Sequence, residues 1–260
     1  QSTVVCCGPA HIQAGFKADL WGADITASLR RVYTGGALCP PETLTSLDAV
    51  LANGKVHQVW GMTEVLMPII HPLGTALDVR ASSLGTPPTG HEVRIVDENG
   101  VGLDTGQEGE LEMRGPFLMA GYFGNDQANK DSFTDDGWFR TGDIAVIDER
   151  GFVTLTGRVK DVINRGGMKI NPVDIEALMD AHPSVLLSAV VPMPDEVLGE
   201  RACLFLQTVP GETPSLEEVC AYLAEKDVAK LRWPERLVIV EAMPMTATRK
   251  IIKGRLVELL

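Results

Sequence analysis

The sequence predicts an α/β region, then a small barrel or sandwich of short strands, then a compact α+β domain. Two strand-like runs in the first part, residues 29–37 and 56–64, break at glycine. Alternating strands with turns about every 10 residues follow over residues 85–157. From residue 160, apolar stripes at helical spacing alternate with runs typical of buried strands.

Composition fits a globular protein, since 260 residues with 45% apolar content are enough for a packed core. The net charge of −12 argues against nucleic acid or an anionic membrane as the main partner. The five cysteines are odd in number and form no CxxC pair, which favours a reducing cytoplasm over a disulfide framework or a zinc site. We expect Cys6 and Cys7 to serve core packing. No signal peptide or apolar run of 18 residues is present, and because Gln1 is not methionine we expect a piece of a longer protein.

Two motifs in the α/β part have the residue types of a nucleotide site. Gly35-Gly36-Ala37 follows a strand, and glycines there let a flat ring or a phosphate approach the backbone. A tight strand-to-helix turn is the alternative. The run 58–64, QVWGMTE, offers an aromatic plane for a purine, a glycine for clearance, a hydroxyl for a phosphate oxygen and a carboxylate for Mg²⁺. Taken alone, it could equally be a strand end with a capping threonine.

Asp143 and Arg158 are the strongest candidates for holding a ribose. A carboxylate can accept hydrogen bonds from both ribose hydroxyls, and a guanidinium nearby can share the contact. A surface ion pair is the alternative for two isolated charges. They stand in TGD, residues 141–143, and GRVKD, residues 157–161.

The C-terminal domain shows helix starts and a basic final motif. Asn171 before Pro172 predicts a capped helix, and residues 215–218 form a capping box. Lys250 ends the motif 244–250, PMTATRK, where a lysine could neutralise charge that grows between a carboxylate and an α-phosphate. A solvated surface charge is the alternative. We expect strands over residues 185–191, 202–209 and 237–240.

In this order, the motifs resemble the adenylate-forming superfamily of acyl-CoA synthetases, aryl-acid ligases and peptide synthetase adenylation domains. WGMTE is similar to the superfamily's YGxTE with Trp60 in place of tyrosine, and PMTATRK is similar to PxTxxGK with Arg249 in place of glycine. GELEMRG, residues 109–115, with the later Gly121-Tyr122, is similar to a GELxxxG and GY motif of the superfamily, and we expect these residues to serve as scaffold. The superfamily's earlier Ser/Thr/Gly-rich phosphate loop has no match here, so the resemblance covers its later half only.

The resemblance implies three regions. Residues 1–84 would be the later part of a large α/β adenylation domain, and residues 85–159 its β-barrel-like subdomain. Residues 160–260 would be a small, mobile α+β domain that carries the catalytic lysine.

The resemblance also implies roles for single residues. The catalytic residues would be Lys250, Thr63 and Glu64, with Glu64 also holding Mg²⁺, and Lys160 would be the hinge. Gly166 and Gly167 would line the channel for a pantetheine thiol. ATP would be bound by Gly35, Gly36, Ala37, Gln58, Trp60, Gly61, Asp143 and Arg158.

The implied activity is that of an AMP-forming ligase that uses ATP, Mg²⁺ and coenzyme A to activate a carboxylic acid and convert it to a thioester. An aryl-acid ligase that loads a carrier protein shares the same motifs, and CoA is favoured because CoA ligases are the commoner class. A luciferase-like oxygenase is a further alternative. Without the phosphate loop, the chain could also act only as a binding or docking module. The motifs do not specify the acyl group.

Overall fold

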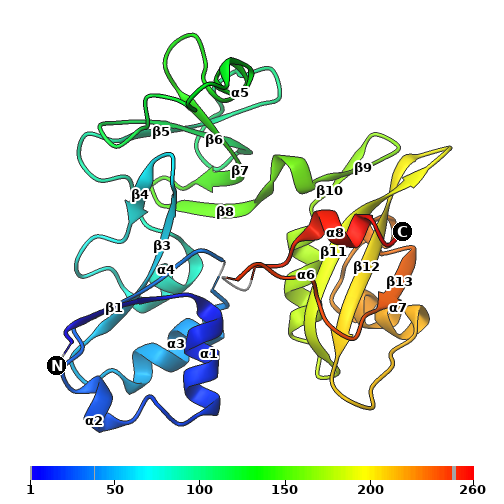
Figure 1. The fold of residues 1–260 in the computed structure, drawn as a ribbon, viewed down its shortest axis with the longest axis horizontal. Helices are drawn as coiled ribbons and strands as arrows, with labels where there is room; N and C mark the ends of the chain where they lie inside the picture. The colour runs from blue at the N-terminus through cyan, green and yellow to red at the C-terminus, as the bar shows by residue number, and fades with distance from the viewer. Residues whose placement is uncertain (1, 38, 248–249) are drawn as a thin grey trace. The chain divides into compact units, whose positions relative to one another are not determined.

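The computed structural model describes residues 2–37, 39–247 and 250–260. The chain separates into two compact units, Gln1–Leu155 and Thr156–Leu260 (Figure 1). Both units combine helices with sheets, which confirms the predicted α/β class. Among the described residues, no helix is long and apolar enough to cross a membrane.

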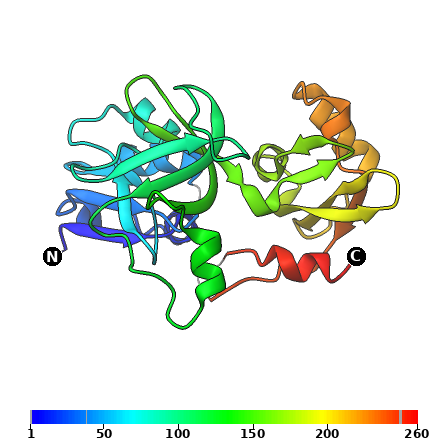
Figure 2. The same ribbon diagram turned by 90° about the horizontal axis from the view of Figure 1, so that it is seen from above.

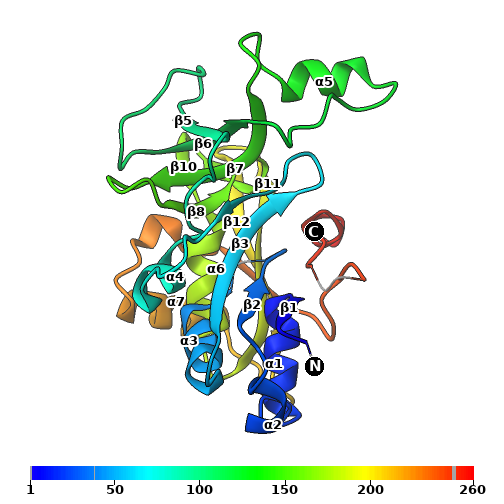
Figure 3. The ribbon, with the colours of Figure 1, turned by 90° about the vertical axis from the view of Figure 1, so that its left-hand side faces the viewer.

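The first sheet of the first unit has the strand order β1-β2-β3-β4, with β1 to β3 parallel and β4 antiparallel to β3. Figure 3 shows β3 as the long cyan strand of this sheet. Its strands are β1 (Val4–Cys7), β2 (Arg31–Thr34), β3 (Lys55–Met62) and β4 (Leu66–Ile70). The helices of this region are α1 (Pro9–Lys17), α2 (Ala23–Thr26), α3 (Pro41–Val50) and α4 (Leu77–Ser82). Because β1 to β3 are parallel, their carboxyl ends meet at one edge of the sheet.

The second sheet has the order β5-β6-β7-β8 and forms where short alternating strands are expected. Its elements are β5 (Glu92–Val96), β6 (Glu108–Arg114), α5 (Asp126–Ser132), β7 (Phe139–Ile147) and β8 (Val153–Arg158). The core of this sheet is continuous with the end of the first sheet, because Trp60 and Ile69 pack in one cluster with Leu111 and Phe139. The two sheets of this unit therefore share one hydrophobic core.

The second unit contains a five-stranded sheet with the order β10-β9-β12-β11, and β13 pairs with β12. Figure 2 shows the long β12 strand in yellow and α7 in orange. The elements up to β11 are the short 3-10 helix η1 (Val159–Asp161), β9 (Ile163–Arg165), β10 (Met168–Ile170), α6 (Pro172–Asp180) and β11 (Val185–Asp195). They are followed by β12 (Gly199–Thr208), α7 (Leu216–Glu225), η2 (Lys230–Arg232), β13 (Arg236–Ile239) and α8 (Lys253–Val257).

The helices α6 and α7 start where the sequence predicts, whereas α8 was not predicted. The Asn171 side chain accepts a hydrogen bond from the Val173 N–H, and Ser215 with Glu218 forms a complete capping box. The strand expected over 185–191 is longer than predicted, because it continues to Asp195 in a hairpin with β12. Its two prolines, Pro192 and Pro194, are tolerated because β11 lies at the edge of the sheet.

Candidate active site

A cavity of about 200 Å³ lies at the carboxyl ends of the parallel strands. Ligands of open α/β sheets bind at such edges. Three of the predicted nucleotide-site glycines, Gly35, Gly36 and Gly61, line this cavity. The other described residues that line it are Cys6, Cys7, Tyr33, Val59 and Met67, none of which is charged.

Close backbone approach explains the glycines. A Cβ at Gly35 would lie 2.7 Å from the Val59 carbonyl oxygen, and one at Gly61 would lie 1.8 Å from the Leu66 carbonyl oxygen. Gly36 has a φ of +82°, in the left-handed region that favours glycine. The packing thus accounts for glycine at these sites whether or not a ligand is bound.

Gln58 and Ala37 occupy different surroundings. Gln58 is buried, and its side-chain oxygen accepts a hydrogen bond of 3.2 Å from the Cys39 N–H. The Gln58 amide therefore fixes the loop that follows β2. Ala37 is exposed in that loop.

Thr63 and Glu64 lie in the tight turn that joins β3 to β4. Leu66 closes the turn with a φ of +61°, an unfavourable conformation for a leucine. The Tyr122 hydroxyl donates a hydrogen bond of 2.9 Å to Glu64 Oε1, and the Met119 N–H donates one of 2.8 Å to the Glu64 carbonyl. The turn thus places the exposed hydroxyl of Thr63 next to the half-buried carboxylate of Glu64 in the chain.

The donor set around Glu64 is compatible with Mg²⁺. Over the described ranges 2–37, 39–247 and 250–260, no group of three or more His, Cys, Asp or Glu could hold a metal ion. Mg²⁺ keeps several waters and is usually bound through one or two carboxylates plus substrate phosphates. A single carboxylate beside a hydroxyl fits that mode.

Trp60 and Asp143 are joined directly. The Trp60 indole N–H donates a hydrogen bond of 2.8 Å to Asp143 Oδ2. Both residues are buried, with exposed fractions of 7% and 2%. The Trp60 ring packs in the core cluster between the two sheets, so its use as a platform for a purine stays a prediction.

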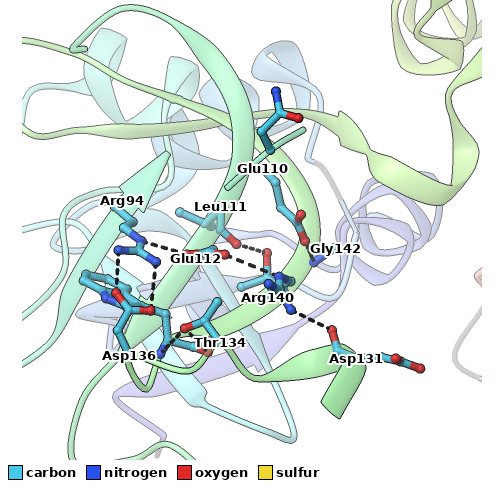
Figure 4. A network of polar contacts seen from close by, with 12 residues as sticks. Arg94, Glu110, Leu111, Glu112, Asp131, Thr134, Asp136, Arg140 and Gly142 are labelled. Atoms are coloured by element: carbon cyan, nitrogen blue, oxygen red, sulfur yellow. Dashed lines mark hydrogen bonds and ion pairs between the residues drawn. The ribbon is translucent and has the colours of Figure 1, made fainter. Parts of the chain in front are cut away.

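The strand that carries Asp143 is fixed by further polar contacts. The Thr141 hydroxyl donates to the Leu111 carbonyl at 2.7 Å and accepts from the Asp143 N–H at 3.1 Å. The intervening Gly142 has a φ of +71°, and its N–H donates to Glu110 Oε1 at 3.2 Å (Figure 4). Gly142 is thus required by the backbone conformation that sets the direction of Asp143.

Figure 4 also shows a charged network that joins β5, β6 and β7. Glu112 is completely buried, and its Oε2 accepts a hydrogen bond of 2.7 Å from Arg94 Nε. Arg140 Nε lies 3.6 Å from the other oxygen of Glu112, and Arg94 also pairs with Asp136 at 3.0 Å. A buried carboxylate between two guanidiniums fixes the register of these strands, and hence the position of residues 141–143.

Two buried histidines lie beneath the cavity. The His57 ring is 5.8 Å from the Tyr33 ring, and Tyr33 lines the cavity. The His71 ring lies 5.9 Å from the His57 ring. Burial, with the nearby positive charge of Arg80, lowers the pKa of His57 to about 4. Burial likewise lowers the pKa of His71 to about 4. Both rings are therefore neutral near physiological pH.

The remaining predicted residues belong to the second unit. Arg158 ends β8 and Lys160 lies in η1, and both are exposed. Gly166 and Gly167 form the tip of the β9–β10 hairpin with φ values of +58° and +89°. This turn geometry requires glycine-like conformations at both positions.

Lys250 is exposed at the end of a hairpin-like segment. The Thr246 N–H donates to the Lys250 carbonyl at 2.8 Å, and the Lys250 N–H donates to the Thr246 hydroxyl at 3.0 Å. Arg249, which replaces the expected glycine, lies outside the described residues.

Comparison with known protein families gives two matches along the chain. The family model for the AMP-binding enzyme matches residues 1–123, and the model for the AMP-binding enzyme C-terminal domain matches residues 174–250. The chain belongs to this family of AMP-binding enzymes. The two matched regions fall in the first and the second unit respectively.

Relatives of the AMP-binding chain include ligases for fatty and aromatic acids. The medium-chain-fatty-acid–CoA ligase of Ectopseudomonas oleovorans is 36% identical over 96% of this chain and 47% of its own length. The 2,3-dihydroxybenzoate-AMP ligase of Bacillus subtilis is 36% identical over 90% of this chain and 43% of its own length. The ATP-bound MatB structure from Rhodopseudomonas palustris has a TM-score of 0.90 at 30% identity, covering 100% of this chain and 51% of that one. The chain thus spans about half the length of these relatives.

Sequence reasoning missed two features of this site. Cys6 and Cys7 were expected in the core, but Cys6 is exposed and both line the cavity. That expectation was wrong for Cys6, because β1 is the edge strand of its sheet among the described residues. Cys7 is half-buried and packs against the core cluster of the first sheet, as expected. Tyr122 was assigned to the scaffold, yet it contacts Glu64. Its position in the GY motif was the only available signal.

Proposed function

We propose that this chain carries the nucleotide-binding and lysine-bearing parts of an AMP-forming ligase that joins a carboxylic acid to a thiol. The proposal rests on how the first unit brings the predicted nucleotide-site residues together. A glycine-lined cavity lies at the carboxyl ends of β1 to β3, and β3 leads directly into the Thr63–Glu64 turn. The same strand supplies Trp60, which contacts Asp143.

In the first half-reaction, a carboxylate oxygen attacks the α-phosphorus of ATP, and pyrophosphate leaves with the electrons of the broken P–O bond. Gly35, Gly36, Ala37, Gln58, Trp60 and Gly61 would surround the adenine, and Asp143 and Arg158 would hold the ribose. Thr63 would bind the α-phosphate and Glu64 would bind Mg²⁺, which screens phosphate charge. Lys250 would donate to oxygens of both reactants, where negative charge builds up in the transition state.

In the second half-reaction, a thiol attacks the acyl carbon of the adenylate, loses its proton and displaces AMP. Lys160 would act as the hinge that replaces Lys250 with the Gly166–Gly167 hairpin, which would line the channel for a pantetheine arm. Such a channel needs a backbone without bulky side chains, and the two glycines meet this need. We place the reaction in the cytoplasm, which agrees with five free thiols in the described part of the chain.

CoA is the proposed thiol, with a carrier-protein phosphopantetheine as the second candidate. The similarity to the fatty-acid–CoA ligase supports the first, and the similarity to the 2,3-dihydroxybenzoate-AMP ligase supports the second. Incubating the enzyme and a turned-over acid with free CoA or with a holo carrier protein distinguishes the two acceptors.

The deciding experiment measures pyrophosphate release from ATP over a panel of fatty and aryl acids. It compares the 260-residue chain with any longer protein that contains it. Release that depends on one class of acid supports the proposal and identifies the substrate. If neither protein releases pyrophosphate with any acid, but the chain still binds nucleotide, the chain is a binding module and the proposed ligase activity is wrong.

A further inference from the structure

Lys253 joins three segments of the second unit. Its ammonium nitrogen lies 2.7 Å from Glu176 Oε1 on α6 and 3.8 Å from Asp161 Oδ2 at the end of η1. The Lys253 side chain is only 23% exposed, and those of Glu176 and Asp161 are 17% and 23% exposed. Most lysine side chains are largely exposed to solvent. Lys253, on the short helix α8, is instead mostly buried and paired with two carboxylates.

The site around Glu176 is built to hold a cation. Glu176 Oε1 also accepts a hydrogen bond of 2.7 Å from the Val190 N–H on β11. Burial raises the pKa of Glu176, and the adjacent ammonium of Lys253 opposes this rise. Removing one partner of such a pair leaves the other charge desolvated, so breaking this pair costs more than breaking a surface ion pair.

Chain connectivity ties this pair to Lys250. Lys253 follows Lys250 by three residues, so their Cα atoms can be at most roughly 11 Å apart. Between the two lysines, the Ile252 N–H donates a hydrogen bond of 2.8 Å to the Pro244 carbonyl. Ile251 forms an antiparallel β-bridge with Met245. Beyond Lys253, the fully buried Leu256 anchors α8 in the core.

We propose that Lys253 is a positioning residue that clamps the described residues of the segment 244–252, Lys250 among them, onto α6 and η1. Lys253 itself takes no part in bond making. Asp161 follows Lys160 directly, so the clamp also connects the catalytic-lysine segment with the proposed hinge. The role assigned to Lys250 in this statement rests on the proposed function, whereas the clamp rests on the contacts of Lys253.

Hydrogen exchange measured on the 260-residue chain tests the clamp without any activity. Lys253→Met should raise the exchange rate of the amides of residues 245–247 and 250–252 by at least about 10-fold, the equivalent of roughly 1.4 kcal/mol. Lys253→Arg retains a cation and should keep most of the protection. Lys230→Met removes an exposed lysine of the same unit and should leave this segment unchanged.

The double variant Lys253→Met with Glu176→Gln separates the clamp from simple misfolding. It removes both charges of the Lys253–Glu176 pair, so position 176 carries no uncompensated charge, and the unit should fold. Residues 245–247 and 250–252 should still exchange faster than in the wild type. Wild-type protection of this segment in both Lys253→Met and the double variant would overturn the clamp.

Partial reactions test the consequence for Lys250. In the enzyme, Lys253→Met should slow adenylate formation by about 10-fold or more, while thioester formation from supplied adenylate stays within about twofold. Lys253→Arg should restore adenylation. Faster exchange with unchanged adenylation, or equal loss of both half-reactions, would refute the positioning role. Should the wild type show no adenylation, the proposed function fails, and hydrogen exchange still decides the clamp.

Discussion

The indole N–H of Trp60 donates a hydrogen bond of 2.8 Å to the carboxylate of Asp143, a residue 83 positions further along the chain. The contact joins β3, which borders the glycine-lined cavity, to β7 of the second sheet. Because the acceptor is a buried carboxylate, the bond is of the stronger, charge-assisted kind. The bond fixes the orientation of the Asp143 carboxylate through its Oδ2 atom. The carboxylate can accept further hydrogen bonds from other partners.

Replacing Trp60 by phenylalanine should weaken nucleotide binding. Trp60→Phe keeps a flat ring but removes the N–H, so Asp143 loses a donor and its orientation. We expect ATP affinity to fall by about 10-fold and the free energy of unfolding by about 1 to 3 kcal/mol. Calorimetric titration and chemical denaturation measure the two effects.

Trp21→Phe is the matched control for that change. The Trp21 indole donates to the Ile12 carbonyl at 2.9 Å, away from the cavity residues. Its loss should lower stability and leave ATP affinity unchanged. If both variants bind ATP like the wild type, Trp60 has no role in orienting Asp143.

A methyl group at Gly61 should disrupt the turn that carries Thr63 and Glu64. The new Cβ would lie 1.8 Å from the Leu66 carbonyl, a backbone atom that cannot yield without moving the turn. We expect Gly61→Ala to lower the free energy of unfolding by about 2 kcal/mol or more and to weaken ATP binding.

Gly22→Ala is the comparison for Gly61. Nothing lies within 4 Å of a Cβ at Gly22, and its φ of −73° suits alanine. Thermal unfolding should therefore show little change for Gly22→Ala. Equal melting temperatures for the two variants would mean that the turn is not packed as described.

The buried histidines should make the first unit sensitive to mild acid. The folded-state pKa values of His57 and His71 are about 4, below the ordinary value of 6.5. Between these pH values the unfolded chain binds protons that the folded chain excludes, so stability falls as the pH drops from 6.5 towards 4. Each histidine contributes a slope of up to about 1.4 kcal/mol per pH unit.

His57→Phe isolates this effect. Neither ring nitrogen of His57 has a hydrogen-bond partner among the described residues, so phenylalanine removes the titration without breaking such a bond. Denaturation curves at several pH values should show a flatter dependence for the variant over this interval. Parallel curves for variant and wild type would show that His57 titrates normally.

Thiol labelling should distinguish the cysteines. Cys6 is exposed and lines the cavity, whereas Cys39 and Cys203 are buried. Burial raises the pKa of both buried thiols to about 11, so few are thiolates near neutral pH. A maleimide should modify Cys6 first, and a bound adenylate should slow that modification. Mass spectrometry of the peptides identifies the order, and faster labelling of Cys39 would contradict the structure.

Local sequence rules predicted the elements of the fold better than the side-chain contacts. The capping box at Ser215 and the Asn171 cap are encoded within a few residues, and both form as expected. The contacts of Trp60 with Asp143 and of Tyr122 with Glu64 join residues 83 and 58 positions apart. Such pairs depend on how sheets pack, which no local pattern specifies.

The exposure of Cys6 illustrates the same limit. Two apolar residues precede the cysteine pair in a strand, a pattern that favours burial. Whether the end of a strand is covered depends on which strand lies at the edge of the sheet. Here β1 takes the edge position, and its carboxyl end opens into the cavity.

Lys250 is assigned to the adenylation step, and measuring both half-reactions in the Lys250→Ala variant tests this assignment. Pyrophosphate release would be measured with ATP and acid, and thioester formation with supplied acyl-adenylate and CoA. We predict a loss of about 100-fold or more in the first reaction, with the second within about twofold of the wild type. Equal loss in both reactions, or full adenylation by the variant, would contradict the assignment of Lys250.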